Sequence, residues 1–466
     1  MTGYAVLIPE LLLVAGAMWA LFAELLPGKD RGAAWLGAAL AAVASVLAAA
    51  QSTGTVSPFG DLLAFDGPAR FARVAIGILA AIWLLWTAGR GTGRLREAVS
   101  LALFTAVGAM FMAEARELIT LVVAIELATM PAYVLMGYRK DDVRGLEGAL
   151  KYFLLSMLTS LVMLYGFSFL YGLTGSTHYA RLDLSGAGTL GLLALLMSLV
   201  GMLAKLSAAP FHYWAPDAYE GASPWSVAFV STVPKVAGAL AIVRLLSAVA
   251  PSVGATGSLL AVVAVASMLL GNLGALTQTD LRRLMAYSGV AHAGYLLLGA
   301  AALSSGGYLA AVFYVVAYAI PSMGVMLVAA EEGPALADFT GLARRRPAVA
   351  WSVVVMLLSL IGVPPLFGFF GKLSLFTAAL QGGLVVPVVL AVMMSVVSAG
   401  YYLRIVRAMF SERPSEAPDA ELSTTQSLPV KPSRAGSVAL GACAVAVIGL
   451  GLAAGPLIGA LGQLAR

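Results

Sequence analysis

Residues 201–238 read GMLAKLSAAPFHYWAPDAYEGASPWSVAFVSTVPKVAG, and they place two lysines, Lys205 and Lys235, among apolar and small side chains. The first lysine belongs to a weakly charged stretch that runs from Gly186 to Tyr219. As one straight helix this stretch would reach roughly 50 Å, whereas the hydrocarbon core of a bilayer is ~30 Å thick. Pro210 interrupts it, because proline removes an amide donor that the interior of a helix needs. We therefore predict a broken helix that crosses a membrane.

A second stretch of the same kind runs from Pro347 to Gln381 and is interrupted by Pro364-Pro365. Each of the two stretches contains the tripeptide Lys-Leu-Ser, with Lys205 before its proline and Lys372 after it. Paired broken helices in the two halves of a chain are typical of inverted-repeat transporters, whose sites lie near the membrane midplane. The sequence therefore predicts a transporter-like architecture with a lysine beside each break.

The composition is that of a membrane protein along its whole length. Hydrophobic residues make up 61% of the 466 residues and charged residues only 11%, whereas soluble proteins carry about 25% charged residues. Apolar runs recur from end to end, so we predict one all-α polytopic transmembrane domain, 1–466, with about fourteen membrane-spanning helices. The expected spans are 4–26, 33–51, 70–89, 97–114, 117–138, 147–172, 187–214, 223–249, 257–277, 284–303, 306–330, 347–380, 385–410 and 436–462.

The basic residues of the loops predict the orientation of the chain. Loops after odd-numbered spans are rich in Lys and Arg, as in Arg139-Lys140 and Arg344-Arg345-Arg346, whereas loops on the other side hold few. The positive-inside rule places the basic loops in the cytoplasm, including the polar stretch from Ser411 to Ser433, and both termini on the periplasmic side. The net charge of +5 lies in these loops, without the aromatic-lined basic patch of a nucleic-acid binder. We therefore expect the lipid bilayer, and no nucleic acid, as a partner.

Titratable side chains inside the predicted spans are the candidate functional residues. Glu126 lies in the fifth span, Lys205 in the seventh, Lys235 in the eighth, His292 in the tenth and Lys372 in the twelfth. A charge at mid-bilayer costs roughly 2.5 kcal/mol or more, so such residues usually mark an ion or substrate path. Lysine, unlike arginine, can lose its proton when it is desolvated. We predict a proton relay through the glutamate and the three lysines.

Each candidate also has a simpler interpretation. Glu126 and Lys205 can form a static buried ion pair, and His292 can be a hydrogen-bonded packing residue. Lys151, near the start of the sixth span, lies at i+4 from Glu147, and it can snorkel to the cytoplasmic surface instead of joining the path. We interpret the many Met and aromatic residues as packing or lipid-facing side chains.

The sequence shows no pattern of a cofactor or metal site. The three histidines are isolated, the single cysteine lies in an apolar run, and there is no HExxH, CxxC or phosphate-binding glycine loop. Such spacings are what zinc, iron–sulfur and nucleotide sites require. We therefore expect no metal or redox cofactor in this chain.

The motifs around the candidate residues resemble those of a known family. They are IELATMPAYVLMGY (125–138), GLEGALKYFLLS (145–156), GNLGALTQTDLRRLMAYSGVAHAGYLLLG (271–299) and SLIGVPPLFGFFGKLSLF (359–376), together with the stretch 201–238. In combination they resemble the antiporter-like membrane subunits of the proton-pumping NADH-quinone oxidoreductase, respiratory complex I, and among these the subunit N family. The likeness runs from about residue 95 to residue 410.

This resemblance implies a fold of fourteen helices with two inverted five-helix repeats, in which helices 7 and 12 are broken. The chain would divide into peripheral helices 1–3 (1–95), a first repeat of helices 4–8 (96–250), a second repeat of helices 9–13 (251–411), a cytoplasmic loop (412–435) and helix 14 (436–466).

The resemblance also implies roles for the candidate residues. Glu126 and Lys205 would form a charge pair, Lys235 a central link, and Lys372 the terminal protonatable group. Supporting positions are expected at Glu147, Lys151 and His292.

By the same resemblance, the partners are the other membrane subunits of complex I, both antiporter-like and small, in a cell inner membrane. The cofactors NAD, FMN, iron–sulfur clusters and quinone are expected in partner subunits. Subunits of Mrp-type Na⁺/H⁺ antiporters and of membrane-bound hydrogenases share the core and stay open as alternatives, as does a structural subunit whose charges only stabilise assembly. Lys372 stands where subunit M typically has Glu, and the chain ends soon after the last span, without the long lateral helix of subunit L. Both features favour the subunit N family.

Overall fold

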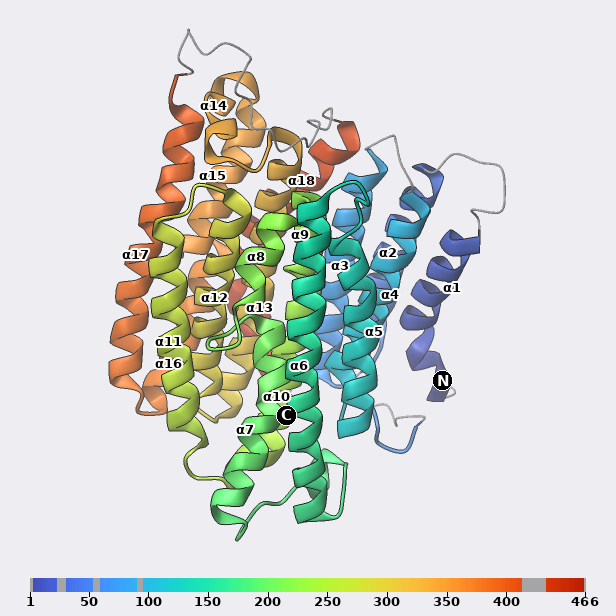
Figure 1. The fold of residues 1–466 in the computed structure, drawn as a ribbon, viewed down its shortest axis with the longest axis vertical. Coiled ribbons are helices and arrows are strands. Elements are labelled where there is room, and N and C mark those ends of the chain that lie inside the picture. Colours follow the sequence, from blue (N-terminus) through green and yellow to red (C-terminus); the bar gives the residue numbers. More distant parts are fainter. Residues whose placement is uncertain (1–2, 23–30, 53–58, 90–94, 413–432, 465–466) are drawn as a thin grey trace.

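The computed structural model describes residues 3–22, 31–52, 59–89, 95–412 and 433–464. These residues form a bundle of long, roughly parallel helices (Figure 1). Strand-like pairing among the described residues is limited to isolated bridges, such as Leu63 with Ala115. Most of the predicted cytoplasmic loop, 413–432, lies outside the described residues.

The helices follow the predicted spans closely. In chain order they are η1 (Gly3–Leu7), α1 (Ile8–Phe22), α2 (Arg31–Ala50), α3 (Gly67–Ala88), α4 (Leu95–Glu114), α5 (Leu118–Met136), α6 (Val143–Thr174), η3 (Tyr179–Arg181), α7 (Gly188–Leu206), α8 (Trp214–Gly221), α9 (Pro224–Val230), α10 (Val233–Val249), η4 (Ala250–Ser252), α11 (Thr256–Leu276), α12 (Leu281–Ala300), α13 (Ser305–Glu332), η5 (Leu336–Phe339), α14 (Leu342–Arg345), α15 (Pro347–Ile361), α16 (Phe367–Gln381), α17 (Val385–Phe410), α18 (Arg434–Leu452) and α19 (Ala454–Leu464).

Twelve of the described helices are long and apolar enough to cross a membrane. The other two predicted spans are α12, which begins with Leu281-Arg282-Arg283 and is rich in small residues, and the two-part helix α15–α16. Hydrophobic run length predicts these positions well, because a helix in lipid must satisfy its own backbone hydrogen bonds across the apolar layer.

The two predicted breaks are present. The helix α7 ends at Leu206, and Ser207 follows in the left-handed conformation, with φ 60° and ψ 36°. The helix α15 ends at Ile361, and Gly362 follows with φ 95°. At each break the chain then passes a proline before the second half-helix begins, at Trp214 in α8 and at Phe367 in α16. Helices 7 and 12 are thus each built from two half-helices.

A third break was not predicted. The eighth span, expected to be continuous over 223–249, is divided between α9 and α10 at Ser231 and Thr232. Pro234 lies in the first turn of α10, where proline is tolerated because the amides of a first turn have no partner within the helix. Lys235 therefore lies at the start of a new helix instead of in the middle of a long one. The last span is also divided, into α18 and α19 at Ala453.

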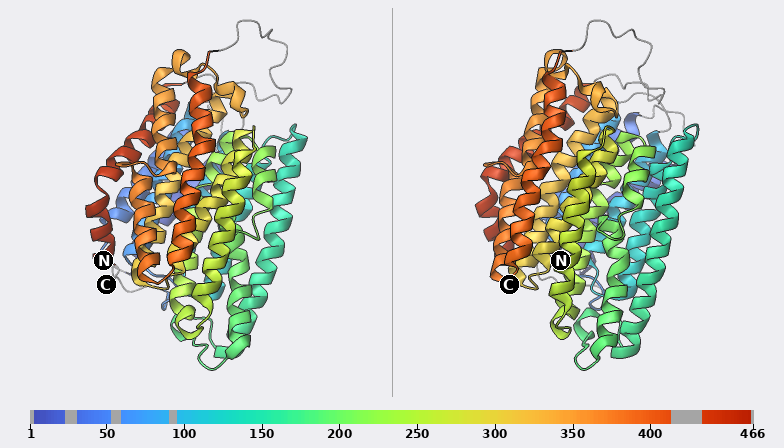
Figure 2. Two further views of the ribbon diagram at one scale, coloured as in Figure 1. Left: turned by 90° about the vertical axis from the view of Figure 1, so that its left-hand side faces the viewer. Right: turned by 60° about the vertical axis from the view of Figure 1, so that its left-hand side comes forward.

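Two spans form the centre of the molecule. An 18-residue stretch of the α9–α10 span and one of α13 are wholly buried inside the structure, whereas only 33% of such a stretch in α6 and 28% in α17 is buried. The helix α13 packs against α9, α10, α12 and both halves of the second broken helix. Figure 2 shows α5–α7 on one side of the bundle and α15–α17 on the other. The central pair therefore connects the two broken helices.

Candidate functional site

Lys205 lies in the last turn of α7 and is 5% exposed. Its ammonium group donates to the hydroxyl of Tyr133 on α5, at 3.1 Å, and to the hydroxyl of Ser156 on α6. The Tyr133 hydroxyl in turn donates to Ser156 at 2.8 Å. The C-terminal end of a helix carries partial negative charge, which favours a cation in the last turn. The break of α7 thus places Lys205 where its charge is supported by a helix end and two hydroxyls.

Glu126 reaches the same group of hydroxyls from α5. One carboxylate oxygen accepts a hydrogen bond of 3.2 Å from Ser160, which lies one helical turn after Ser156 on α6. The other carboxylate oxygen is buried and has no hydrogen-bond partner among the described residues. Within that part of the chain, Glu126 and Lys205 make no direct contact. The predicted charge pair therefore stays a prediction, and its two members contact serines one helical turn apart on α6.

Glu126 also lies on an outward-facing stripe of α5. The exposed residues of this helix are Ile119, Val123, Met130 and Val134, each more than half exposed. Glu126 is partly exposed and falls on the same helical face by its spacing. Its carboxylate is held inside this face, since one oxygen is bonded to Ser160 and the other is buried. Whatever covers this face of α5 therefore lies close to the carboxylate.

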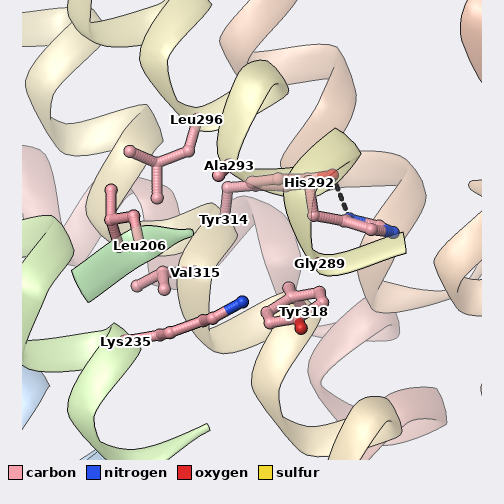
Figure 3. Close-up of a pocket in the computed structure, with 9 residues that line it drawn as sticks. All are labelled: Leu206, Lys235, Gly289, His292, Ala293, Leu296, Tyr314, Val315 and Tyr318. Atoms are coloured by element: carbon pink, nitrogen blue, oxygen red, sulfur yellow. Dashed lines mark hydrogen bonds between the residues drawn. The ribbon is translucent and has the colours of Figure 1, made fainter. Parts of the chain in front are cut away.

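Lys235, on α10, is 3% exposed. Its ammonium group has no hydrogen-bond partner among the described residues, and it lies over the ring of Tyr318, 5.4 Å from the centroid. A Cβ atom on Gly289 would come within 2.7 Å of the Lys235 nitrogen, so glycine leaves the space that the ammonium group occupies. The side chain points into a small cavity, shown in Figure 3, that has room for about one water molecule. A water there would supply the missing partner.

His292, on α12, lines the same cavity (Figure 3). Its Nδ1 atom is 2.6 Å from the hydroxyl of Tyr314 on α13, and its Nε2 atom is 3.2 Å from the hydroxyl of Tyr402 on α17. Both ring nitrogens are thus hydrogen-bonded, as a packing role requires. The same contacts also join three helices around the cavity of Lys235, as a relay role requires.

Lys372, on α16, is 4% exposed and reaches back across the second break. Its ammonium group donates to the carbonyl of Ile361, the last residue of α15, and to the hydroxyl of Ser395 on α17, each at 2.8 Å. The last carbonyls of a helix have no partner within the helix, so a cation there is favoured. Lys205 and Lys372 stand on opposite sides of their prolines, yet both belong to the end of the first half-helix, Lys205 as a residue of its last turn and Lys372 through its bond to Ile361.

The tyrosines around these groups were not predicted as part of the site, because the aromatic residues were interpreted as packing or lipid-facing side chains. Besides Tyr314 and Tyr402, Tyr295 lies under Lys372, with its ring centroid 4.8 Å from the ammonium nitrogen. Tyr295 also accepts a hydrogen bond from Asn272, to which Tyr401 donates at 3.1 Å. The spacing of Tyr314 and Tyr318, one turn apart on one helix, was the available signal. Each of the two lysines lies over a tyrosine ring, and tyrosine hydroxyls with His292 and Asn272 form hydrogen bonds in the region between them.

The first half is less continuously polar toward Lys235. Leu206, the residue after Lys205, lines the cavity of Lys235. Among the described residues, no hydrogen bond joins Lys235 to the hydroxyls of Tyr133 and Ser156 that contact Lys205. An apolar side chain therefore stands between the two lysines in this structure.

Lys151 and Glu147 lie at the surface, at the start of α6. The predicted i, i+4 pair is present at 2.8 Å, and Lys151 also contacts Asp217 of α8 at 3.3 Å. The Lys151 side chain is 44% exposed. These residues line an open cavity of about 500 Å³, whose other charged walls include Arg144, Glu220, Asp280 and Arg282. The pairing is confirmed, and a role in the proton path stays a prediction.

The family model that matches this chain is described as "NADH:quinone oxidoreductase/Mrp antiporter, TM" and covers residues 115–398. That range is more than half of the chain and contains every candidate residue named above. The chain belongs to this family. The resemblance noted from the motifs is thereby confirmed, and the fold with broken helices 7 and 12 is the fold of the family's antiporter-like subunits.

Individual members of the family are similar over nearly the whole chain. The NADH-quinone oxidoreductase subunit N of Maricaulis maris is 37% identical over 423 residues, which cover 87% of this chain and 88% of the relative. A chain of respiratory complex I from Thermus thermophilus with bound aureothin has a TM-score of 0.84 and 33% identity, covering 97% of this chain and 99% of that one. A chain of the Mrp complex from Dietzia sp. has a TM-score of 0.85 and 25% identity, covering 100% and 97%.

Proposed function

We propose that this protein is a proton-translocating membrane subunit of an NADH-quinone oxidoreductase complex. The observation that carries the proposal is the state of the three buried lysines. Lys205, Lys235 and Lys372 are at most 5% exposed, and none has a carboxylate within ion-pair distance in the part of the chain that the structure describes. A permanently charged lysine in such a place would cost several kcal/mol. Groups that alternate between charged and neutral forms suit these positions.

The proposed path runs along the middle of the membrane. A proton held near Glu126 would pass through the hydroxyls of Ser160 and Ser156 to Lys205, then past Leu206 to Lys235. From there the cavity, His292 and the tyrosines lead to Lys372. We place Glu147 and Lys151 in a supporting role, at the charged cavity where the predicted cytoplasmic side begins, and His292 in a supporting role on the path.

The energy for pumping would come from neighbouring subunits. Glu126 lies on an outward-facing stripe of α5, so a membrane subunit that covers this face can change the charge or hydration around the carboxylate. NADH oxidation and quinone reduction, with FMN and iron–sulfur clusters, belong to other subunits in this proposal. The described residues contain no group of three or more His, Cys, Asp or Glu placed to hold a metal ion. The basic loops lie in the cytoplasm and both termini outside, in a cell inner membrane.

The test is proton pumping by the assembled complex in membrane vesicles. We expect Glu126→Gln and Lys372→Ala to abolish most NADH-driven acidification while the complex still assembles. Lys140→Ala is the matched control, because Lys140 is an exposed loop lysine. Normal pumping in both variants, at normal assembly, would contradict the relay.

Sodium–proton exchange is the second candidate function, supported by the likeness to a chain of the Mrp complex from Dietzia sp.. A sodium site needs several oxygen ligands. Vesicles with an imposed sodium gradient separate the two functions. Proton movement driven by that gradient without NADH, and lost in Glu126→Gln, would favour exchange over redox-driven pumping.

A further inference from the structure

A second group of buried charges lies outside the lysine row. It consists of Glu10 on α1, Arg73 on α3 and Glu114 at the end of α4, which are 1%, 1% and 0% exposed. All three precede residue 115, where the family match begins. The sequence analysis did not single them out, and the proposed proton path does not use them.

The guanidinium group of Arg73 donates four hydrogen bonds to Glu10 and its neighbours. Its Nε and one terminal nitrogen each contact a different oxygen of Glu10 at 2.7 Å, a bidentate pair. The same terminal nitrogen donates to the carbonyl of Val6 at 2.9 Å, and the other donates to the side chain of Gln51 at 2.8 Å. Glu10 is therefore the carboxylate that neutralises Arg73.

Glu114 lies beside this pair without a hydrogen bond of its own. One of its oxygens is 2.8 Å from the Nε atom of Arg73. That nitrogen carries one hydrogen, which is directed at Glu10. Neither oxygen of Glu114 has a hydrogen-bond partner among the described residues. An ionised carboxylate in this position would be desolvated beside a guanidinium group whose charge Glu10 already neutralises.

The other charged groups around the cluster are already paired or lie at its edge. Arg244 of α10 makes a bidentate contact with Asp66, the residue before α3, and donates to the carbonyl of Ala113. Arg116 pairs with Asp61 at the surface, and Arg70 donates to the backbone of Gln51. The cluster itself thus combines two carboxyl groups with one guanidinium group.

We propose that Glu114 is a protonated carboxylic acid that shares its proton with Glu10, so that Glu10, Arg73 and Glu114 form a proton-binding site apart from the lysine row. The acid O–H donates toward a carboxylate oxygen of Glu10, which has lone pairs free beyond its bonds to Arg73. One proton then satisfies both carboxyl groups, and the cluster is neutral. The site lies in the N-terminal helices, and its existence does not depend on the proposed function.

The first test is infrared spectroscopy of the assembled, purified complex at neutral pH. We expect the wild-type-minus-Glu114→Gln difference spectrum to contain the C=O stretching band of a protonated carboxyl group, with a shift in heavy water. Glu10→Gln should remove the same band, because Glu114 would then ionise to pair with Arg73. A Glu114→Gln difference spectrum that shows only carboxylate bands overturns the proposal, and so does a band that survives in Glu10→Gln.

The second test uses the amount of assembled complex and its resistance to heat. Glutamine imitates a protonated glutamate, so Glu114→Gln should match or exceed the wild type, and Glu10→Gln should cause a small loss. The double variant leaves Arg73 without an anion and should lose far more than the two single losses combined. A severe loss in Glu114→Gln alone would show that Glu114 is the ionised partner, and additive losses would show that the two carboxyl groups are independent. Either result overturns the shared proton.

Discussion

At the first break, Lys205 belongs to α7, and its ammonium group contacts hydroxyls on α5 and α6. At the second, Lys372 belongs to the half-helix after the break, and besides the hydroxyl of Ser395 it contacts a backbone carbonyl of the half-helix before it. Hydroxyls can donate as well as accept, whereas a carbonyl only accepts. The first half also has a carboxylate, Glu126, which accepts a hydrogen bond from Ser160, one helical turn after Ser156. In the second half, His292 and tyrosines surround the proposed path to Lys372. The two halves thus share a backbone plan but hold their lysines by different chemistry.

The largest expected effect comes from removing the ability of either lysine to lose a proton. Lys205→Arg and Lys372→Arg keep the positive charge, but arginine stays protonated at any physiological pH. We expect each variant to lower NADH-driven proton pumping about tenfold or more, on the scale of lost acid–base groups. Vesicle acidification measures the effect, and the NADH-quinone reductase rate with an uncoupler serves as reference. Full pumping in Lys372→Arg would show that Lys372 acts as a fixed charge. The two halves would then differ in whether their lysine must lose a proton.

The next effect concerns the link between the halves. In Gly289→Ala the new Cβ atom would stand 2.7 Å from the nitrogen of Lys235 and 2.9 Å from the hydroxyl of Tyr318. Both atoms end flexible side chains, so the fold should survive while the ammonium group is displaced from its cavity. We expect severalfold slower pumping at normal assembly. Gly306→Ala is the control, because nothing lies within 4 Å of a Cβ atom there; equal rates in the two variants would remove the cavity from the path.

A smaller effect tests the difference between the lysine environments directly. Ser156→Ala removes the acceptor of the Tyr133 O–H as well as one of the two partners of Lys205, whereas Ser395→Ala removes only one of the two partners of Lys372. A buried polar group left without a partner costs about 1–3 kcal/mol. We expect the serine of the first half to matter more, as measured by initial rates of vesicle acidification. The reverse order would mean that the carbonyl of Ile361 contributes little to holding Lys372.

The smallest effect concerns the ion pair between Asp66 and Arg244, in the C-terminal half of α10. Burial alone would raise the pKa of the Asp66 carboxyl, but the charge and hydrogen bonds of Arg244 hold that pKa below its usual value. A lowered pKa contributes stability above the unfolded-state pKa, and this stability is lost as the pH falls through the folded-state value. The heat resistance of the purified complex should therefore decrease on acidification, and less steeply in Asp66→Asn. Identical acid profiles would show that the pair adds nothing to stability.

The sequence predicted the fold well where lipid imposes a rule. Apolar run length located the spans, and Pro210 and Pro364-Pro365 located two breaks, because an uninterrupted helix of that length does not fit the bilayer. The break before Lys235 was missed, since its span has an ordinary length and Pro234 occupies a tolerated first-turn position. A sequence indicates a break only when the apolar run is too long for one membrane-spanning helix and a proline lies in its interior.

The sequence singled out the ionisable residues of the candidate site and not the neutral ones around them. A lysine in an apolar run can be recognised from the sequence alone. A tyrosine hydroxyl joins a polar site only when another helix provides a hydrogen-bond partner, as α12 provides His292 for Tyr314. The group of Glu10, Arg73 and Glu114 was missed for the same reason. Its members lie near the ends of three different spans, where charged residues are ordinary, and only packing brings them together.

The hydrogen bond from Lys372 to Ile361 joins two half-helices that the break allows to move separately. Any rotation of α16 against α15 changes this distance, so the proton affinity of Lys372 depends on the hinge angle of helix 12. Lys205 instead contacts hydroxyls on α5 and α6, which lie outside its own broken helix. Bending within helix 12 would therefore change the contacts of Lys372 directly, whereas the contacts of Lys205 change only when helix 7 moves against its neighbours.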